Sequence, residues 1–330
     1  MDSLNSSEPP VFADVEDAAR QLNGWARLTP ILENPVLNET LGCRLLVKPE
    51  CLQRTGSFKF RGAFNKISRI PDADKAAGVV AYSSGNHAQG VAHAAALMGL
   101  KATIIMPEDA PKAKIDNTRA LGGNVVLYDR YTQSREEIGL KLQAETGAML
   151  VKPYDDPFVI AGQGTVGLEI AVQTAALDVT PDMVIVPAGG GGLISGTALA
   201  IDGTLGCPVY AAEPDAFDDH KRSLESGARQ TVPDDARSIC DSLLAPTPGE
   251  ITFSINGRLL AGGLSVSDDE ALSAMKTAMT SLKIVVEPGG AVALASVLSG
   301  KIDVAGKTVV VVCSGGNVDV DMLARALSTA

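Results

Sequence analysis

The alternation of short Val/Ile runs with longer amphipathic segments is the feature that most constrains the fold. In the first half of the chain, runs at residues 78–84 and 102–107 are each followed by a helix-like segment, and the same order returns between residue 165 and the run at 307–313. Near-continuous Val/Ile runs indicate strands that are buried on both faces, as parallel sheets require. Strands that alternate with helices predict βαβ units. The chain is therefore predicted to be α/β, with two parallel-sheet units.

Composition narrows the class of protein. The chain has 330 residues, 45% of them hydrophobic, which suits one large or two moderate α/β domains. The net charge of −11 argues against a nucleic-acid partner, because such a surface needs positive charge. No run approaches the ~18 apolar residues of a membrane-spanning helix, the N-terminus lacks a signal sequence, and the five cysteines include no CxxC pair. We expect a cytoplasmic protein without membrane or nucleic-acid partners.

Three strand ends are rich in glycine and polar residues. They are Ser83 to His87, Gly189 to Leu193, and Cys313 to Asn317. In open α/β sheets, ligands bind beyond the carboxyl ends of the strands. These three segments are therefore the first candidates for a ligand site. The stretch from Glu213 to Ser265 has few periodic runs and many Pro, Asp and Gly residues, which predicts irregular structure near that site.

The four consecutive glycines at residues 189–192 suggest a phosphate site. Between a strand and a helix, their backbone N–H groups can converge on an anion, and the helix N-terminus adds favourable partial charge. A turn needed only for close packing is the structural alternative. A dinucleotide site is a second alternative, because Gly190, Gly192 and Gly196 are followed by Glu213 after about 20 residues, although the GxGxxG spacing is absent. The loop alone leaves these alternatives open.

Lys59 is the strongest candidate for a catalytic group. It lies between Phe58 and Phe60, and desolvation by such neighbours lowers a lysine pKa and frees the amine for Schiff-base chemistry. An isolated lysine more often extends its stem over an apolar surface. This lysine is not isolated, because Ser-Phe-Lys-Phe-Arg-Gly-Ala precedes Ser-Ser-Gly-Asn-His, the tetraglycine loop and Cys-Ser-Gly-Gly-Asn in that order.

Together these four motifs resemble those of the fold-type II (tryptophan synthase β-like) pyridoxal-phosphate enzymes. The chain is most similar to the branch of serine/threonine dehydratases and serine racemase, from about Thr29 to Leu323. The resemblance implies two parallel-sheet α/β domains with pyridoxal 5'-phosphate between them. The large domain is expected at residues 1–69 and 155–330, and the small inserted domain at residues 70–154.

The resemblance also implies roles for individual residues. Lys59 would carry the cofactor as a Schiff base, Phe58 would lie beside the pyridine ring, and Asn86 would bond the phenolic oxygen. The phosphate would be held by Gly189, Gly190, Gly191, Gly192 and Leu193. Ser314 would face the pyridine nitrogen. A neutral hydroxyl there makes the ring a weaker electron sink than an aspartate would, which favours elimination of a β-substituent.

Substrate contacts are implied for a second set of residues. The substrate carboxylate would bind at Ser83, Ser84, Asn86 and His87, whose hydroxyls and N–H groups can pair with an anion. Ser84 would also act catalytically, from the face opposite Lys59. Arg135 matches a family position near the substrate, with a solvated helix residue as the alternative. The chain departs from the family at Ser242, where relatives have glycine, so the shape of that pocket wall stays open.

These roles predict a lyase that acts on a small amino acid. The expected reaction is α,β-elimination of a β-hydroxy amino acid of the serine, threonine or 3-hydroxyaspartate type, giving a 2-oxo acid and ammonia. An amino-acid racemase and a cysteine-synthase-like β-replacement enzyme are the enzymatic alternatives. An amino-acid or nucleotide binding protein without catalysis is the non-enzymatic one. A homodimer is expected.

An acidic segment predicts a divalent cation site. Carboxylates at Glu213 and Asp219 could converge on Mg²⁺, Mn²⁺ or Ca²⁺, which prefer oxygen ligands, and the resemblance implies the Phe217 carbonyl as a further ligand. A solvated acidic turn is the alternative. His93 and His220 lack HExxH spacing, so neither a zinc site nor a hydrolase is predicted.

Overall fold

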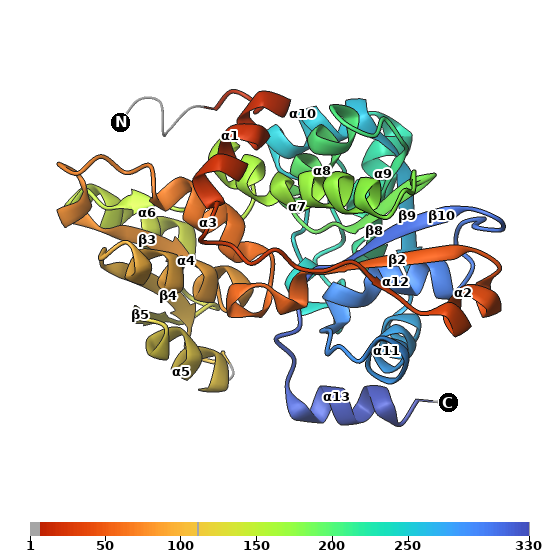
Figure 1. Ribbon diagram of the computed structural model, residues 1–330. Coiled ribbons are helices and arrows are strands. Elements are labelled where there is room, and N and C mark those ends of the chain that lie inside the picture. The colour runs from red at the N-terminus through yellow and green to blue at the C-terminus, as the bar shows by residue number, and fades with distance from the viewer. Residues whose placement is uncertain (1–6, 111, 330) are drawn as a thin grey trace.

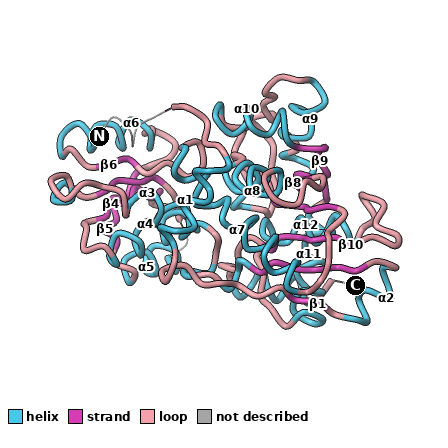
Figure 2. The backbone as a smooth tube through the Cα atoms, turned by 45° about the horizontal axis from the view of Figure 1, so that its top comes forward, coloured by secondary structure: helices cyan, strands magenta, loops and turns pink. Residues whose placement is uncertain are grey.

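The structure is a computed structural model, and it describes residues 7–110 and 112–329. Its strands form two sheets that lie side by side, the smaller one built from the orange to yellow part of the chain in Figure 1. Figure 2, from a second direction, again shows two separate groups of strands. The predicted α/β class with two parallel-sheet units is confirmed.

The larger sheet has six strands in the order β1-β2-β10-β7-β8-β9. Strand β1 runs antiparallel to β2, and the other neighbours pair in parallel. The strand bounds are β1 (Leu32–Glu33), β2 (Arg44–Pro49), β7 (Met183–Pro187), β8 (Val209–Pro214), β9 (Leu260–Val266) and β10 (Thr308–Cys313). Because β10 lies between β2 and β7, the loops after β7 and β10 leave the sheet side by side at one edge.

The smaller sheet has four parallel strands in the order β5-β4-β3-β6. Their bounds are β3 (Val79–Tyr82), β4 (Ala102–Pro107), β5 (Gly123–Tyr128) and β6 (Met149–Leu150). All four strands therefore lie inside the inserted segment expected at residues 70–154, although the domain boundaries themselves remain a prediction.

Helices cover both sheets. The α-helices are α1 (Phe12–Leu22), α2 (Pro35–Leu41), α3 (Lys59–Ile67), α4 (Asn86–Leu97), α5 (Lys112–Ala120), α6 (Arg135–Thr146), α7 (Pro157–Ala176), α8 (Gly192–Asp202), α9 (Asp219–Ser226), α10 (Glu250–Leu259), α11 (Asp268–Thr277), α12 (Pro288–Leu298) and α13 (Val320–Leu327). Short helical turns are η2 (Glu50–Leu52), η3 (Arg54–Gly56), η4 (Lys75–Ala77), η5 (Asp215–Phe217), η6 (Asp241–Leu243) and the π-helical η7 (Ala278–Leu282).

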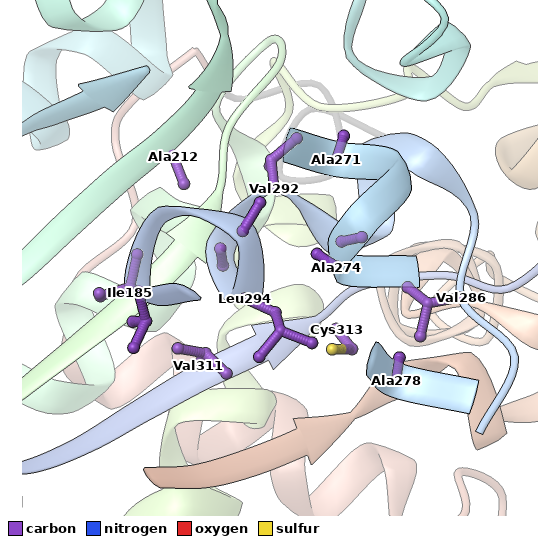
Figure 3. Close-up of a cluster of buried hydrophobic side chains, with 14 of the residues drawn as sticks. Ile185, Ala212, Ala271, Ala274, Ala278, Val286, Val292, Leu294, Val311 and Cys313 are labelled. Atoms are coloured by element: carbon purple, nitrogen blue, oxygen red, sulfur yellow. The ribbon is translucent and has the colours of Figure 1, made fainter. Parts of the chain in front are cut away.

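The strands of the larger sheet are apolar on both faces because helices pack on both sides. Successive side chains of a strand point to opposite faces. Ile185 and Val311 accordingly join α11 and α12 in one core, where Leu294 lies near Val311 (Figure 3), whereas Val186 and Val312 join α7 and α8 in another. This double burial explains the near-continuous Val/Ile runs.

One expectation about local structure was wrong. The stretch from Glu213 to Ser265 is not irregular throughout, because it contains α9, α10 and most of β9. Strand β9 carries two central glycines and lies at the edge of the sheet, next to β8. An edge strand that is buried less than its neighbours lacks the continuous apolar run by which the other strands were recognised.

Within the described residues, none of the helices combines the length and the apolarity that a membrane crossing requires.

Candidate active site

A cavity of about 390 Å³ opens at the carboxyl ends of strands from both sheets. Its lining includes every residue predicted to bind cofactor or substrate, namely Phe58, Lys59, Ser83, Ser84, Asn86, His87, Arg135, Gly189, Gly190, Gly191, Gly192, Leu193 and Ser314. The segments after β3, β7 and β10 meet here with the start of α3, as parallel strands with a common polarity require.

Lys59 projects into this cavity from the first turn of α3. Its Nζ donates a hydrogen bond to the Pro153 carbonyl at 2.7 Å and lies 5.1 Å from the centre of the Phe58 ring. Burial lowers the pKa of Lys59 to about 8, and the nearby Glu287 only partly offsets this. The unprotonated fraction of the amine near neutral pH is therefore much larger than for an ordinary lysine, and a nucleophile for an aldehyde must be unprotonated.

The tetraglycine loop forms a cradle that side chains would fill. A Cβ on Gly190 would lie 2.4 Å from atoms of the Tyr154 ring, and Gly191 has a φ of +99°. The loop runs directly into α8, whose N-terminus has no side-chain cap. Uncapped N–H groups at a helix start bind anions. With Lys59 in the same cavity, these residues fit a cofactor that carries both an aldehyde and a phosphate.

A second helix N-terminus faces the same cavity. Helix α4 begins at Asn86, and its N-cap residue Gly85 also supplies no side-chain cap. Both residues line the cavity together with Ser83 and Ser84. The free N–H groups of this first turn give the pocket a second place for an anion, separate from the tetraglycine loop.

Asn86 is held by two side chains whose role the sequence did not reveal. Its Nδ2 donates to Glu287 Oε1 at 2.6 Å, and its Oδ1 accepts from Asn317 Nδ2 at 2.7 Å. These contacts fix the amide orientation and leave one N–H of Asn86 for a further acceptor. Burial and the charge of Asp241 raise the pKa of Glu287 to about 8. The only local signal for Glu287 is its position before Pro-Gly-Gly at the start of α12.

His87 is neutral in this structure. Burial, together with the charge of Lys59, lowers the pKa of His87 to about 3. Its Nε2 lies 2.8 Å from the Val151 carbonyl, which can only accept a hydrogen bond, so Nε2 carries the proton. Nδ1 is then an acceptor, and within residues 7–110 and 112–329 it has no hydrogen-bond partner.

Ser314 lies where the sequence predicted it, directly after β10 and almost fully buried. Its carbonyl accepts a hydrogen bond from the Phe58 N–H at 3.1 Å. This contact ties the strand end to the residue before Lys59. The two segments that were expected to flank the pyridine ring are therefore joined through their backbones.

Arg135 lines the same cavity from the start of α6. Its guanidinium lies over the Tyr82 ring, with Cζ 5.5 Å from the ring centre, and its Nε donates to Glu136 at 2.8 Å. In the described part of the chain, Glu136 is the only hydrogen-bond acceptor that it reaches. The side chain is about half exposed, so it can reorient toward a bound anion.

Ser242 is accommodated because residue 289 is a glycine. A Cβ on Gly289 would lie 2.3 Å from the Ser242 Oγ. The neighbouring Asp241 forms an ion pair with Lys114 of α5, and both residues line the cavity. The family difference at Ser242 thus leaves the cavity open and places a hydroxyl in its wall.

The residues predicted to bind a cation lie behind the tetraglycine loop. Glu213, Asp219 and His220 are fully buried and present ligand atoms within 4.8 Å of one another. Burial and the charge of Glu213 raise the pKa of Asp219 to about 7. Phe217 is buried at the end of η5, and its carbonyl as a ligand stays a prediction. No local pattern indicated that His220 joins the carboxylates.

Glu213 cannot serve as the ribose ligand of a dinucleotide site. Its two oxygens accept hydrogen bonds from the backbone N–H groups of His220 and Lys221, both at 2.9 Å, and the residue is inaccessible to solvent. A ribose-binding carboxylate must instead face the ligand. The dinucleotide alternative is therefore not supported.

Comparisons with known proteins agree with this site. The model of the family "pyridoxal-phosphate dependent enzyme" matches residues 23–315. Two L-threo-3-hydroxyaspartate ammonia-lyases are similar to the chain. The enzyme of Pseudomonas sp is 44% identical over 317 residues, 96% of this chain and 98% of the relative. That of Saccharomyces cerevisiae is 41% identical over 320 residues, 97% of each.

Among solved structures, a threonine deaminase from T.th. matches with a TM-score of 0.87 and 43% identity, covering 94% of this chain and 99% of that one. The similarity thus extends over most of this chain. The chain belongs to the family of pyridoxal-phosphate dependent enzymes, with the fold-type II architecture.

Proposed function

We propose that this protein is an ammonia-lyase whose preferred substrate is a 3-hydroxyaspartate, which it converts to a 2-oxo acid and ammonia. The observation that carries the choice of substrate is the cationic side chain of Arg135, which lines the cavity from the start of α6. A 3-hydroxyaspartate has a second carboxylate that serine and threonine lack. Both relatives named above are ammonia-lyases of this substrate.

In this proposal, different residues of the cavity bind the cofactor and transfer the proton. When bound, pyridoxal phosphate condenses with an amine and withdraws electron density from the adjacent Cα. The tetraglycine loop and the start of α8 would hold its phosphate, and Ser314 would supply only a neutral hydroxyl near the ring. The amine of Lys59 would accept the proton from the substrate Cα as general base.

The substrate is oriented at two points. The uncapped start of α4, with Ser83 and Ser84, binds the α-carboxylate, and Arg135 binds the distal carboxylate. Loss of the β-hydroxyl gives an enamine that tautomerises and is hydrolysed by water, which releases ammonia. The water eliminated in the first stage is balanced by the water consumed in the last, so the net products are the 2-oxo acid and ammonia.

Arg135→Gln should reduce kcat/KM for 3-hydroxyaspartate while changing kcat/KM for serine little. A charged hydrogen bond to the distal carboxylate is worth about 1.5–3 kcal/mol, which corresponds to a loss of roughly 10- to 150-fold for the dicarboxylic substrate alone. Ammonia release is measured across 3-hydroxyaspartate, serine and threonine. Arg119→Gln, on the exposed part of α5, is the control. An equal loss for all three substrates would contradict the proposed role.

The alternatives are less favoured. Racemisation or β-replacement would use the same Lys59, but the two relatives above are named ammonia-lyases. A binding protein without catalysis does not require a lysine whose pKa is lowered to about 8 inside the cavity. Chiral analysis of serine after incubation tests racemisation, and a sulfide acceptor tests β-replacement.

We also propose that a divalent cation, Mg²⁺, Mn²⁺ or Ca²⁺, binds at Glu213, the Phe217 carbonyl and Asp219. Neither oxygen of Asp219 has a hydrogen-bond partner in the described part of the chain, although the side chain is buried. Buried carboxylates are normally partnered, and two close together repel each other. A cation would neutralise them and fix the loop that follows β8.

Exhaustive chelation should lower both the melting temperature and the activity, and added Mg²⁺ or Mn²⁺ should restore them. An ion at 100 times its Kd stabilises by about 2.7 kcal/mol, which is roughly a 4 °C shift for a chain of this size, at an unfolding entropy of about 2.1 cal/mol/K per residue. Differential scanning fluorimetry measures the shift. Glu213→Gln should weaken this response, whereas Asp321→Asn, on the exposed face of α13, should not. If chelation leaves both quantities unchanged and no metal copurifies, the acidic segment is only structural.

We also propose that the protein forms a homodimer and is located in the cytoplasm. The net charge of −11 supports the expectation that no nucleic acid binds, and sedimentation of the purified holoenzyme measures the number of subunits.

A further inference from the structure

Behind the tetraglycine loop, an imidazole occupies the same buried space as the two carboxylates proposed to bind a cation. Glu213 ends β8, and Asp219 and His220 form the first turn of α9. The Nδ1 of His220 lies 3.3 Å from Glu213 Oε1 and 3.8 Å from Asp219 Oδ2. All three side chains are shielded from solvent, with exposed fractions of 0 to 1%. Bulk solvent therefore does not reach their polar atoms.

Four polar atoms at this point have no hydrogen-bond partner among the described residues. They are both oxygens of Asp219 and both ring nitrogens of His220. Buried polar atoms in folded proteins nearly always have a partner, and a missing ion is one of the few explanations for a group of exceptions. The imidazole of His220 points toward the two carboxylates. Its unpartnered ring nitrogens are evidence for an ion that does not depend on the acidic residues.

A simple hydrogen bond from His220 to Glu213 does not account for this arrangement. The 3.3 Å between Nδ1 and Oε1 exceeds the usual range for an N–H···O bond. Both oxygens of Glu213 already accept backbone N–H groups, from His220 itself and from Lys221. The ring nitrogen is therefore close to the carboxylates without being bonded to either of them, as the ligands of one ion are.

We infer that Nδ1 of His220 is a nitrogen ligand of the cation, and that it makes the site prefer transition ions such as Zn²⁺ or Co²⁺ over Ca²⁺ and Mg²⁺. This inference rests on the cation site proposed above. Carboxylate, carbonyl and water oxygens suit Mg²⁺, Ca²⁺ and Mn²⁺, whereas imidazole suits Zn²⁺ and the neighbouring transition ions. Replacing one oxygen ligand by an imidazole therefore shifts the preference of an otherwise oxygen-rich site.

The other ring nitrogen connects the ion to the cofactor loop. A Cβ on Gly191 would lie 2.8 Å from Nε2 of His220 and equally close to Thr252 Oγ1. Thr252 Oγ1 in turn donates to the Gly190 carbonyl at 2.8 Å. The imidazole thus fills the space directly behind the loop that lines the cavity. An ion that holds the ring of His220 in place would therefore also hold the side chain that packs behind Gly191.

The test uses the metal-stripped holoenzyme reloaded with Mn²⁺ alone. Electron spin-echo envelope modulation should show the ¹⁴N coupling of a directly bound imidazole in the wild type. His220→Gln should still bind Mn²⁺ but lose that coupling. By calorimetry, the same variant should bind Co²⁺ at least roughly tenfold more weakly, while its Ca²⁺ affinity changes less than about threefold. His93→Gln on α4, where the native ring lies 5.8 Å from that of Phe60, is the matched control and should match the wild type in both measurements.

The outcomes separate the two proposals. If Mn²⁺ binds, Glu213→Gln abolishes that binding and no ¹⁴N coupling is seen, His220 is not a ligand and the oxygen-only cation site stands. An equal loss of Co²⁺ and Ca²⁺ affinity in His220→Gln would also overturn the ligand role, since it would indicate a disturbed fold around the site. If no Mn²⁺, Co²⁺ or Ca²⁺ binds to the wild type, both the site and its nitrogen ligand are wrong.

Discussion

Lys59→Ala should abolish ammonia release from every substrate while leaving the fold intact. In the proposed mechanism, the side chain supplies both the amine that condenses with the cofactor and the base that takes the Cα proton. A positioned general base alone contributes about 10²–10⁴-fold, so a loss of at least about 10³-fold is expected. The fold should survive because the hydrogen bond that the Nζ donates goes to the carbonyl of Pro153, another residue of the cavity lining, and not to a residue of the hydrophobic core.

Three measurements check this prediction: steady-state ammonia release, the visible absorbance of the purified protein, and covalent retention of the cofactor after borohydride. The variant should be colourless after dialysis and retain nothing. Lys152→Ala is a matched control, because this exposed lysine directly precedes Pro153, and its activity should stay within about twofold. Near-wild-type turnover by Lys59→Ala would show that Lys59 is not a catalytic residue.

Arg61→Ala should cost about 3–5 kcal/mol of stability, the loss typical of a buried ion pair from which one partner is removed. Arg61 follows Lys59 by two residues on α3 and is almost fully buried. Its Nε and Nη2 donate to the two oxygens of Glu50, each at 2.8 Å, and its Nη1 lies 2.6 Å from Glu169 Oε1. Without the guanidinium, the inaccessible Glu50 keeps, among the described residues, only the hydroxyl of Thr29 as a direct donor to its carboxylate.

Urea unfolding of the holoenzyme measures the loss. Arg20→Ala is the control, because its pair with Asp17 is largely exposed, and exposed pairs contribute about 0–1 kcal/mol. Arg61→Lys should lie between the two, since lysine keeps the charge without the bidentate geometry. A loss below about 1 kcal/mol in Arg61→Ala would show that the buried cluster adds little to stability.

The free energy of unfolding should change with pH in opposite directions in the wild type and in Arg61→Ala. Burial is the largest single effect and would raise the pKa of Glu50, but the charge and hydrogen bonds of Arg61, together with the charge of Lys48 and the hydroxyl of Thr29, outweigh it and hold that pKa below the usual value. The stabilisation in the wild type is therefore present above the unfolded pKa, near ~4.3, and is lost as pH falls through the folded pKa. In Arg61→Ala, burial should dominate, so the variant should gain stability as the pH is lowered from 7 toward 5.

Much of the site could be predicted because its residues lie next to each other in the sequence. Lys59 with its aromatic neighbours, the tetraglycine loop and Ser314 each follow directly from a local pattern at the end of a strand or the start of a helix. The cavity lining then agreed with the prediction, since parallel strands bring their carboxyl ends to one edge of a sheet. Local patterns do not give strand order, and the position of β10 between β2 and β7 was not predicted.

The sequence by itself determined the alternation of strands and helices, the buried character of the strands and the motifs that are expected to bind the cofactor. Only the tertiary structure showed which side chains from distant parts of the sequence contact the residues of these motifs. Glu287 and Asn317 reach Asn86 across 201 and 231 residues of sequence, and His220 turns toward Glu213 rather than solvent. The physical reason is that strand and helix patterns arise from neighbours within a few residues. Partners from different elements meet only when helices dock on the assembled sheets.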